Sequence, residues 1–368
     1  MNRNKDTKAK NVAEENECGR ITCDLLSRQR TILMGLAMLS ILFFHYTEDC
    51  YVNDVHFTGF IRVYKTYIGS AGVDLFLFLS GLGLYYAMKK NSDVIRFYKR
   101  RLVRICIPYL LVSVPMWLLY DILLNKKGLM DVVLDLTFVS FFTAGVRTYW
   151  YIGAILACYM VYPAIFALLE RCRTRVGQWI VCLFLCIAVT LFAIYLSSTD
   201  AELFKRVELA LLRLAPFLIG CFYGRASYEK RHGYWLWGVI AVVSIALVTQ
   251  VPDVGTPIFD RYVLGAAFTS VCACAAILLD RLNKDNGIVR VVSWFGTHSL
   301  EIYLCHVTVR RFLNGIELNT CYVRYEILML ILALVSAWLL QIVVTWLLRG
   351  RKDRKCNLNC NNPSNVLY

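Results

Sequence analysis

Apolar runs of about 20 residues, the length that a membrane-spanning helix needs, recur along most of the 368-residue chain, and short polar stretches separate them. The pattern therefore predicts an all-α, polytopic membrane protein with about ten transmembrane helices. The expected spans lie near residues 31–48, 69–88, 104–124, 148–169, 177–197, 207–224, 233–250, 261–280, 293–312 and 325–348.

Residues 130–144 depart from this pattern, because their apolar stretch is short and carries Asp131 and Asp135. A carboxylate within a span is costly unless it has a partner. We therefore expect an amphipathic or re-entrant segment here rather than another span.

The composition points to the same class of protein. Hydrophobic residues make up 58% of the chain and charged residues 18%, whereas a soluble domain averages about 45–50% and about 25%. The formal net charge is +14, but the basic residues form short clusters between apolar runs, which is typical of cytoplasmic loops. We therefore expect the lipid bilayer as a partner and no nucleic acid. Most of the 15 cysteines lie within apolar runs, and no Cys and His spacing predicts a metal site.

The basic clusters predict the orientation in the membrane. With the N-terminus in the cytoplasm, most Lys and Arg residues fall in the inner loops or the two tails, as the positive-inside rule requires. Lys126 and Lys127 are the clearest exceptions. We expect a disordered cytoplasmic tail over residues 1–30, a transmembrane domain over 31–348 and a polar cytoplasmic tail over 349–368. Cys50 and Cys321 would both lie outside, where a disulfide could join them.

Five segments and one histidine carry a family resemblance. His45 ends the first apolar run, MGLAMLSILFFH. The later segments are GVDLFLFLSGLGLYYAM, FYKRRLVRICIPYLL, TYWYIGAILACYMVYP, RLAPFLIGCFYGR and THSLEIYLCHVTV. Taken in this order, they resemble the acyltransferase 3 family of integral membrane O-acyltransferases, of the bacterial O-acetyltransferase type, over residues 28–348. The family often has a basic residue eleven positions before the histidine. Here that position is Met34, and Arg30, one helical turn earlier, could substitute for it.

The candidate catalytic residues are His45, Asp74, His306 and Arg213. The first three are expected on three helices at the same depth in the outer half of the membrane. Ionisable groups are costly there and usually have a function. His45 could be a general base that deprotonates an acceptor hydroxyl, or a nucleophile that carries the acyl group; it could also be an interfacial histidine. Asp74 could orient His45, with Glu48 as a rival, or make a structural hydrogen bond. Arg213 could pair with Asp74 or stabilise an oxyanion.

Other residues are candidates for substrate binding. Arg100, Arg101 and Arg104, together with Arg30, could bind the phosphates of a cytoplasmic acyl-CoA, although the positive-inside rule alone explains such charges. Glu48 could bind the acceptor. Tyr149 and Trp150 could stack on a sugar ring, or they could belong to an aromatic belt at the membrane interface.

The resemblance implies an enzyme of the plasma or inner membrane that transfers an acyl group, expected to be acetyl. The donor would be acetyl-CoA, without a metal, and the acceptor a hydroxyl of a cell-surface or exported carbohydrate. A transporter that exports an acylated or small polar metabolite is the main alternative, and a structural partner in a polysaccharide assembly complex is another. The sequence specifies no oligomeric state.

Overall fold

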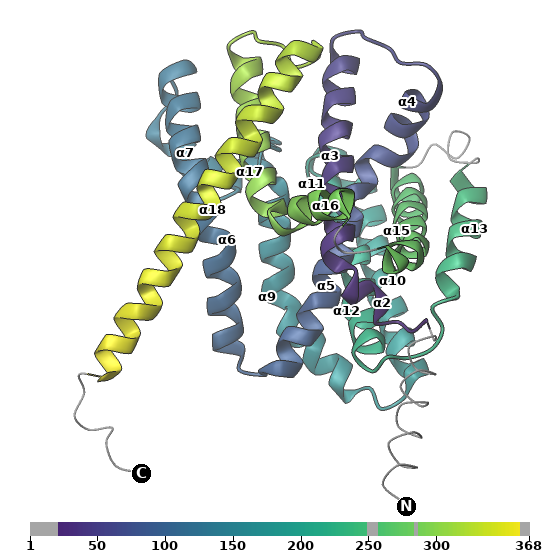
Figure 1. Ribbon diagram of the computed structural model, residues 1–368. Coiled ribbons are helices and arrows are strands. Elements are labelled where there is room, and N and C mark those ends of the chain that lie inside the picture. The colour runs from purple at the N-terminus through teal and green to yellow at the C-terminus, as the bar shows by residue number, and fades with distance from the viewer. Residues whose placement is uncertain (1–20, 249–256, 283–285, 361–368) are drawn as a thin grey trace, which may run out of the picture.

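The computed structural model describes residues 21–248, 257–282 and 286–360, and the regular secondary structure of this part of the chain is entirely helical (Figure 1). Within it, eight helical stretches are long and apolar enough to cross a membrane. They are formed by α3 (Arg30–Val52), α5 (Gly72–Lys90), α6 (Val94–Trp117) with η3 (Leu118–Leu124), α9 (Trp150–Arg171), α10 (Arg175–Thr199), α11 (Ala201–Leu211) with α12 (Leu214–Tyr228), α15 (Pro257–Arg281) and α18 (Val323–Cys360). The protein is therefore a multi-pass, all-α membrane protein.

The count of ten spans is not confirmed. The expected seventh span contains α13 (Leu236–Val248), which has only 13 described residues. The expected ninth span, 293–312, is not one helix, because α16 (Gly287–Thr297) ends at His298 and α17 (Ser299–Gly315) begins there. In Figure 1, α16 lies across α3 whereas α17 runs along the bundle.

The helix bundle has two opposite faces, at which the helices begin and end. The terminal face is the side at which α3 begins, at Arg30, and at which α18 ends; the far face is the side at which α3 ends, at Val52 (Figure 1).

Glycines allow α16 to cross α3 with backbone touching backbone. A Cβ atom added to Gly35 would lie 1.9 Å from the carbonyl oxygen of Val292, and one added to Gly296 would lie 1.8 Å from that of Thr31. Any side chain at either position would force the helices apart. This contact ends α16 beside α3 and lets α17 start in a new direction.

The segment 130–144 does not span the membrane, in agreement with its short length. It forms α7 (Leu129–Leu136) and α8 (Val139–Thr143), which join at Phe138 in the left-handed conformation, with φ 63°. Both helices lie at the far face, where α7 is visible at the end of the bundle in Figure 1.

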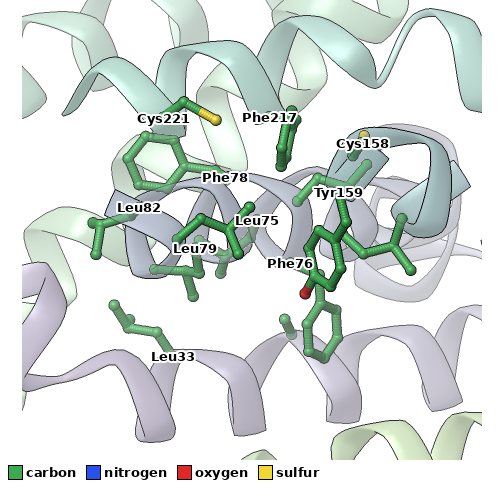
Figure 2. Close-up of a cluster of buried hydrophobic side chains, with 14 of the residues drawn as sticks. Leu33, Leu75, Phe76, Phe78, Leu79, Leu82, Cys158, Tyr159, Phe217 and Cys221 are labelled. Atoms are coloured by element: carbon green, nitrogen blue, oxygen red, sulfur yellow. The ribbon is translucent and has the colours of Figure 1, made fainter. Parts of the chain in front are cut away.

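Helix α5 is the centre of the hydrophobic core. Its side chains pack against α3, α9 and α12, and Figure 2 shows Leu75, Phe78 and Leu82 of this helix among Leu33, Cys158, Phe217 and Cys221. Close approach to α12 depends on small residues: a Cβ at Gly220 would lie 2.1 Å from the carbonyl oxygen of Phe78. The buried cysteines of this cluster act as packing residues.

The ends of the chain only partly test the predicted tails. Residues 1–20 and 361–368 lie outside the described part. Residues 25–28 form the short helix α2 (Leu25–Arg28), in which Leu25 and Leu26 are 1% exposed. The side chain of Gln29 donates to Asp280 at 2.6 Å. The packed chain therefore begins several residues before the predicted boundary at residue 30.

Candidate active site

A cavity of about 1030 Å³ runs through the bundle between α3, α5, α6, α9 and α17. Its terminal-face end is lined by Arg30, Arg101 and Arg104, and its far-face end by His45 and Arg310. Arg30 and His45 both belong to α3, and at 1.5 Å per residue they are about 22 Å apart along its axis. One cavity therefore reaches both the predicted donor-binding arginines and the predicted catalytic histidine.

His45 uses one ring nitrogen for its contacts with the protein. Its Nδ1 lies 3.1 Å from Glu48 Oε2, which is one helical turn further along α3, and 2.8 Å from Nη1 of Arg310. Among the described residues Nε2 makes no hydrogen bond, and His45 lines the cavity. Glu48, the rival to Asp74 as partner of His45, is the carboxylate that contacts the ring.

Arg310 is a site residue that the sequence analysis missed. Its guanidinium contacts His45, lies 3.0 Å from Glu48 Oε2, and donates through Nε to Asp49 Oδ2 at 2.7 Å. Asp49 also accepts a hydrogen bond from Thr320. The sequence did contain two signals for this residue. Arg310 and Arg311 lie at the outer end of an expected span, against the positive-inside rule, and Arg310 lies one helical turn after His306.

His306 lies beside His45, as their predicted depths require. The two ring centroids are 5.1 Å apart. His306 is fully buried, and neither of its ring nitrogens has a hydrogen-bond partner among the described residues. It is not among the residues that line the cavity. His306 is therefore a buried neighbour of His45, and its catalytic role stays a prediction.

Asp74 and Arg213 form a buried ion pair, one of the two arrangements expected for Arg213. Arg213 Nε is 3.6 Å from Asp74 Oδ2, and both side chains are at most 2% exposed. Arg213 also donates to the carbonyl oxygen of Ser70 at 2.8 Å, and its guanidinium lies 5.1 Å from the ring of Trp150. Arg213 lines the cavity and Asp74 does not. Among the described residues Asp74 thus pairs with Arg213 and makes no hydrogen bond to either ring nitrogen of His45.

Arginines gather at the terminal-face end of the cavity. Arg30 donates through Nε to the carbonyl oxygen of Leu79 at 3.1 Å, and its guanidinium occupies space that a side chain at Gly83 would fill. Arg101 lies between the rings of Phe97 and Tyr159. A smaller adjoining cavity of about 290 Å³ shares Arg101 and Arg104 and adds further basic residues, namely Lys90, Arg96 and Arg100. The predicted donor-binding arginines are thus brought together; Arg30 and Met34 both line the larger cavity, and whether Arg30 substitutes for the basic residue usual at position 34 stays a prediction.

The two aromatic candidates differ in their surroundings. Trp150 lines the cavity and stacks on Arg213. Tyr149 is 3% exposed, bonds to Thr308 Oγ1 at 2.6 Å and does not line the cavity. Tyr149 is therefore a core residue rather than one that faces a substrate.

In the described part of the chain no three His, Cys, Asp or Glu side chains are placed to hold a metal ion. The thiols of Cys50 and Cys321 are free, and Cys50 Sγ lies 3.5 Å from the carbonyl oxygen of Cys321.

Comparison with known proteins agrees with the geometry. The family model Acyl_transf_3, described as an acyltransferase domain, matches residues 32–349. No curated protein and no solved structure matches the chain. The match covers most of the sequence and includes every helix that lines the cavity, from α3 to α17. This multi-pass membrane protein therefore belongs to the acyltransferase 3 family.

Proposed function

We propose that this protein transfers an acetyl group from cytoplasmic acetyl-CoA to a hydroxyl of a cell-surface or exported carbohydrate, across the plasma or inner membrane. One observation carries the proposal: a single cavity joins a cluster of arginines at one face to an accessible histidine near the other. The family match supports the acyl-transfer chemistry. The clustering of basic residues supports a cytoplasmic terminal face.

The donor enters from the terminal face in this proposal. Arg30, Arg101 and Arg104 bind the phosphates of the coenzyme, for which the guanidinium fork is well suited. Arg104 is exposed whereas Arg30 and Arg101 are partly buried, which supports a charged headgroup at the mouth of the cavity. The acyl-bearing arm extends inward along α3 and brings the thioester carbonyl to His45.

His45 then activates the acceptor as a general base. With its Nδ1–H donating to Glu48, its Nε2 accepts the proton of the acceptor hydroxyl. The acceptor oxygen forms a bond to the thioester carbonyl carbon, the carbon–sulfur bond breaks, and the leaving thiolate takes the proton from Nε2. The alternative, in which Nε2 itself attacks the thioester and carries the acetyl group, uses the same nitrogen.

The test is acetyl transfer in inside-out membrane vesicles. Labelled acetyl-CoA is added outside the vesicles, a saccharide acceptor is loaded inside, and acetylated saccharide is measured. Replacing His45 with Gln should lower the rate by about 10²- to 10⁴-fold, the usual contribution of a positioned base. His232→Gln, which changes an exposed histidine outside the cavity, should leave the rate unchanged.

The same assay separates the enzyme from a transporter. A transporter would move the saccharide across the membrane while the label stays on coenzyme A, and its activity would not depend on His45. Transfer by the His45→Gln variant at the wild-type rate would contradict the proposed mechanism.

A further inference from the structure

Arg311 occupies a pocket that suits a cation but leaves its charge uncompensated. Its Nη1 donates to Thr148 Oγ1 at 2.7 Å, and its guanidinium lies 4.2 Å from the ring centroid of Tyr120 and 5.2 Å from that of Trp117. Its Nε is buried and has no hydrogen-bond partner in the described part of the chain. No described carboxylate lies within 4 Å of it, in contrast to Arg310, the preceding residue.

The charge of the whole cavity is strongly positive. The described residues that line it include nine Lys or Arg and two Glu. Three of the nine, Arg30, Arg101 and Arg104, belong to the proposed donor end. Of the six nearer the far face, Arg213, Arg310 and Arg147 have a carboxylate within 4 Å. The other three, with no such partner among the described residues, are Lys65, Arg261 and Arg311.

Arg261 and Lys65, which have no carboxylate partner, contact other groups. Arg261 donates to Ser70 Oγ at 3.3 Å, and the Lys65 ammonium lies 2.9 Å from the ring centroid of Tyr51. Burial lowers the pKa of Lys65 from its ordinary value, and the nearby Glu48 carboxylate acts in the opposite direction. These contacts are weaker than a carboxylate pair, so the far-face end of the cavity keeps an excess of positive charge.

The uncompensated charge lies close to the reacting centre. Arg310 and Arg311 are consecutive residues of α17, and both line the cavity. Arg310 contacts His45, while Arg311 turns toward η3 and the residues before α9. His45, Arg310 and Arg311 thus line one cavity, so a saccharide in it can be large enough to reach both His45 and Arg311.

Cations without counter-ions are rare within membrane proteins and mark sites for anions. We propose that the acceptor is an anionic saccharide, bearing a carboxylate or a phosphate, and that Arg311 binds this group while His45 activates a neighbouring hydroxyl. Arg311 bonds to the protein through Nη1. Its Nη2 has no hydrogen-bond partner among the described residues and can donate to a carboxylate or a phosphate. This inference rests on the proposed function and names the substrate class of the same site.

The test measures saccharide binding without a donor. Full-length protein is placed in nanodiscs of phosphatidylcholine, and dissociation constants are measured by saturation-transfer NMR for methyl glucuronoside, glucose 1-phosphate and methyl glucoside. The two anionic probes should bind more tightly than the neutral one, and less tightly as salt is added. Arg311→Gln should weaken binding of the anionic probes by about tenfold, as expected for one lost charge-assisted hydrogen bond, and leave methyl glucoside unchanged.

Two further variants serve as controls. Arg311→Lys keeps the charge without the fork and should give an intermediate loss, which also shows that the site can fold without arginine. Arg62→Gln removes an exposed arginine of the helix α4 (Gly59–Val63) that does not line the cavity, and it should bind all probes as the wild type does.

Three outcomes would overturn the inference. The first is equal binding of charged and neutral probes by the wild type. The second is loss of methyl glucoside binding in parallel with the anionic probes in Arg311→Gln. The third is loss of saccharide binding when phosphatidylglycerol is added to the nanodiscs, since a lipid headgroup would then occupy the site. Because no acetyl-CoA is present, failure of acetyl transfer would be seen separately and would count against the proposed function instead.

Discussion

At the residue scale, the contacts of His45 determine which of its nitrogens is basic. Its Nδ1 can donate to Glu48 or accept from Arg310, but a single nitrogen cannot do both. Donation to Glu48 leaves Nε2 without a proton and able to act as a base. Acceptance from Arg310 places the proton on Nε2. Asp49 accepts from Nε and Nη2 of Arg310, while Nη1 faces His45 Nδ1. The proposed mechanism uses the tautomer in which Nδ1 donates to Glu48.

We expect Glu48→Gln to lower the rate constant for acetyl transfer by about 10²- to 10⁴-fold, because the amide can no longer select the tautomer with a free Nε2. The KM for acetyl-CoA should change little, since the donor arginines are untouched. Steady-state kinetics in vesicles measures both quantities. Glu202→Gln, at an exposed position in the first turn of α11, is the matched control. A change confined to KM would argue against this role of Glu48.

The Asp74–Arg213 pair makes a prediction about stability. Removing either partner leaves a buried charge without compensation, so Asp74→Asn and Arg213→Gln should each lower the free energy of unfolding by about 3–5 kcal/mol. The double variant Asp74→Leu, Arg213→Met should recover part of this loss, because no charge remains to be buried. Denaturant unfolding in mixed micelles measures the four proteins. Additive losses in the double variant would show that the two charges do not interact.

At the element scale, α3 and the α16–α17 pair carry the reacting groups, and the crossing of α3 and α16 fixes how they meet. Helix α3 carries Arg30 and His45, and α17 carries Arg310. The backbone contact at Gly35 and Gly296 is the point at which the α16–α17 pair is fixed to α3. A shift at this point displaces Arg310 relative to His45.

We expect Gly296→Ala to cost about 1–3 kcal/mol in stability, as overpacking usually does, and to lower acetyl transfer because α17 moves. The measurement is thermal unfolding together with the vesicle assay. Gly238→Ala is the matched control, since a Cβ there meets nothing within 4 Å; it should be neutral or stabilising by up to about 1 kcal/mol. Equal effects of the two substitutions would show that the crossing is not tight.

At the scale of the whole molecule, the positive-inside pattern supports the proposed cytoplasmic terminal face. The apparent exception at Lys127 has a local cause. Its ammonium lies 3.1 Å from Oδ1 of the fully buried Asp121. Its charge is therefore compensated within the protein and carries little weight in the orientation.

Reporter fusions test this orientation. Alkaline phosphatase, which is active only outside the cytoplasm, should be active when fused after Lys127 and inactive when fused after His232. Green fluorescent protein should give the opposite result. Activity of the phosphatase at both positions would contradict the proposed orientation.

The sequence predicted the class of fold and part of the site, because membrane length and charge cost leave strong patterns. The proximity of His306 to His45 agrees with their predicted depth, and the pairing of Arg213 with Asp74 is one of the two alternatives that the sequence left open. The break between α16 and α17 was not predicted; it lies at His298, next to the close contact of Gly296 with α3. Arg310 and Arg311 were missed because only the packed structure shows that they face the cavity.

The proposed function links acetylation outside the cell to the coenzyme A pool inside it. Donor and acceptor reach the cavity from opposite faces, so they never share a solution, and spent coenzyme A returns to the compartment that supplied it. The extent of surface acetylation should then follow the ratio of acetyl-CoA to free coenzyme A inside the cell. The degree of acetylation at the cell surface would therefore depend on carbon metabolism in the cytoplasm.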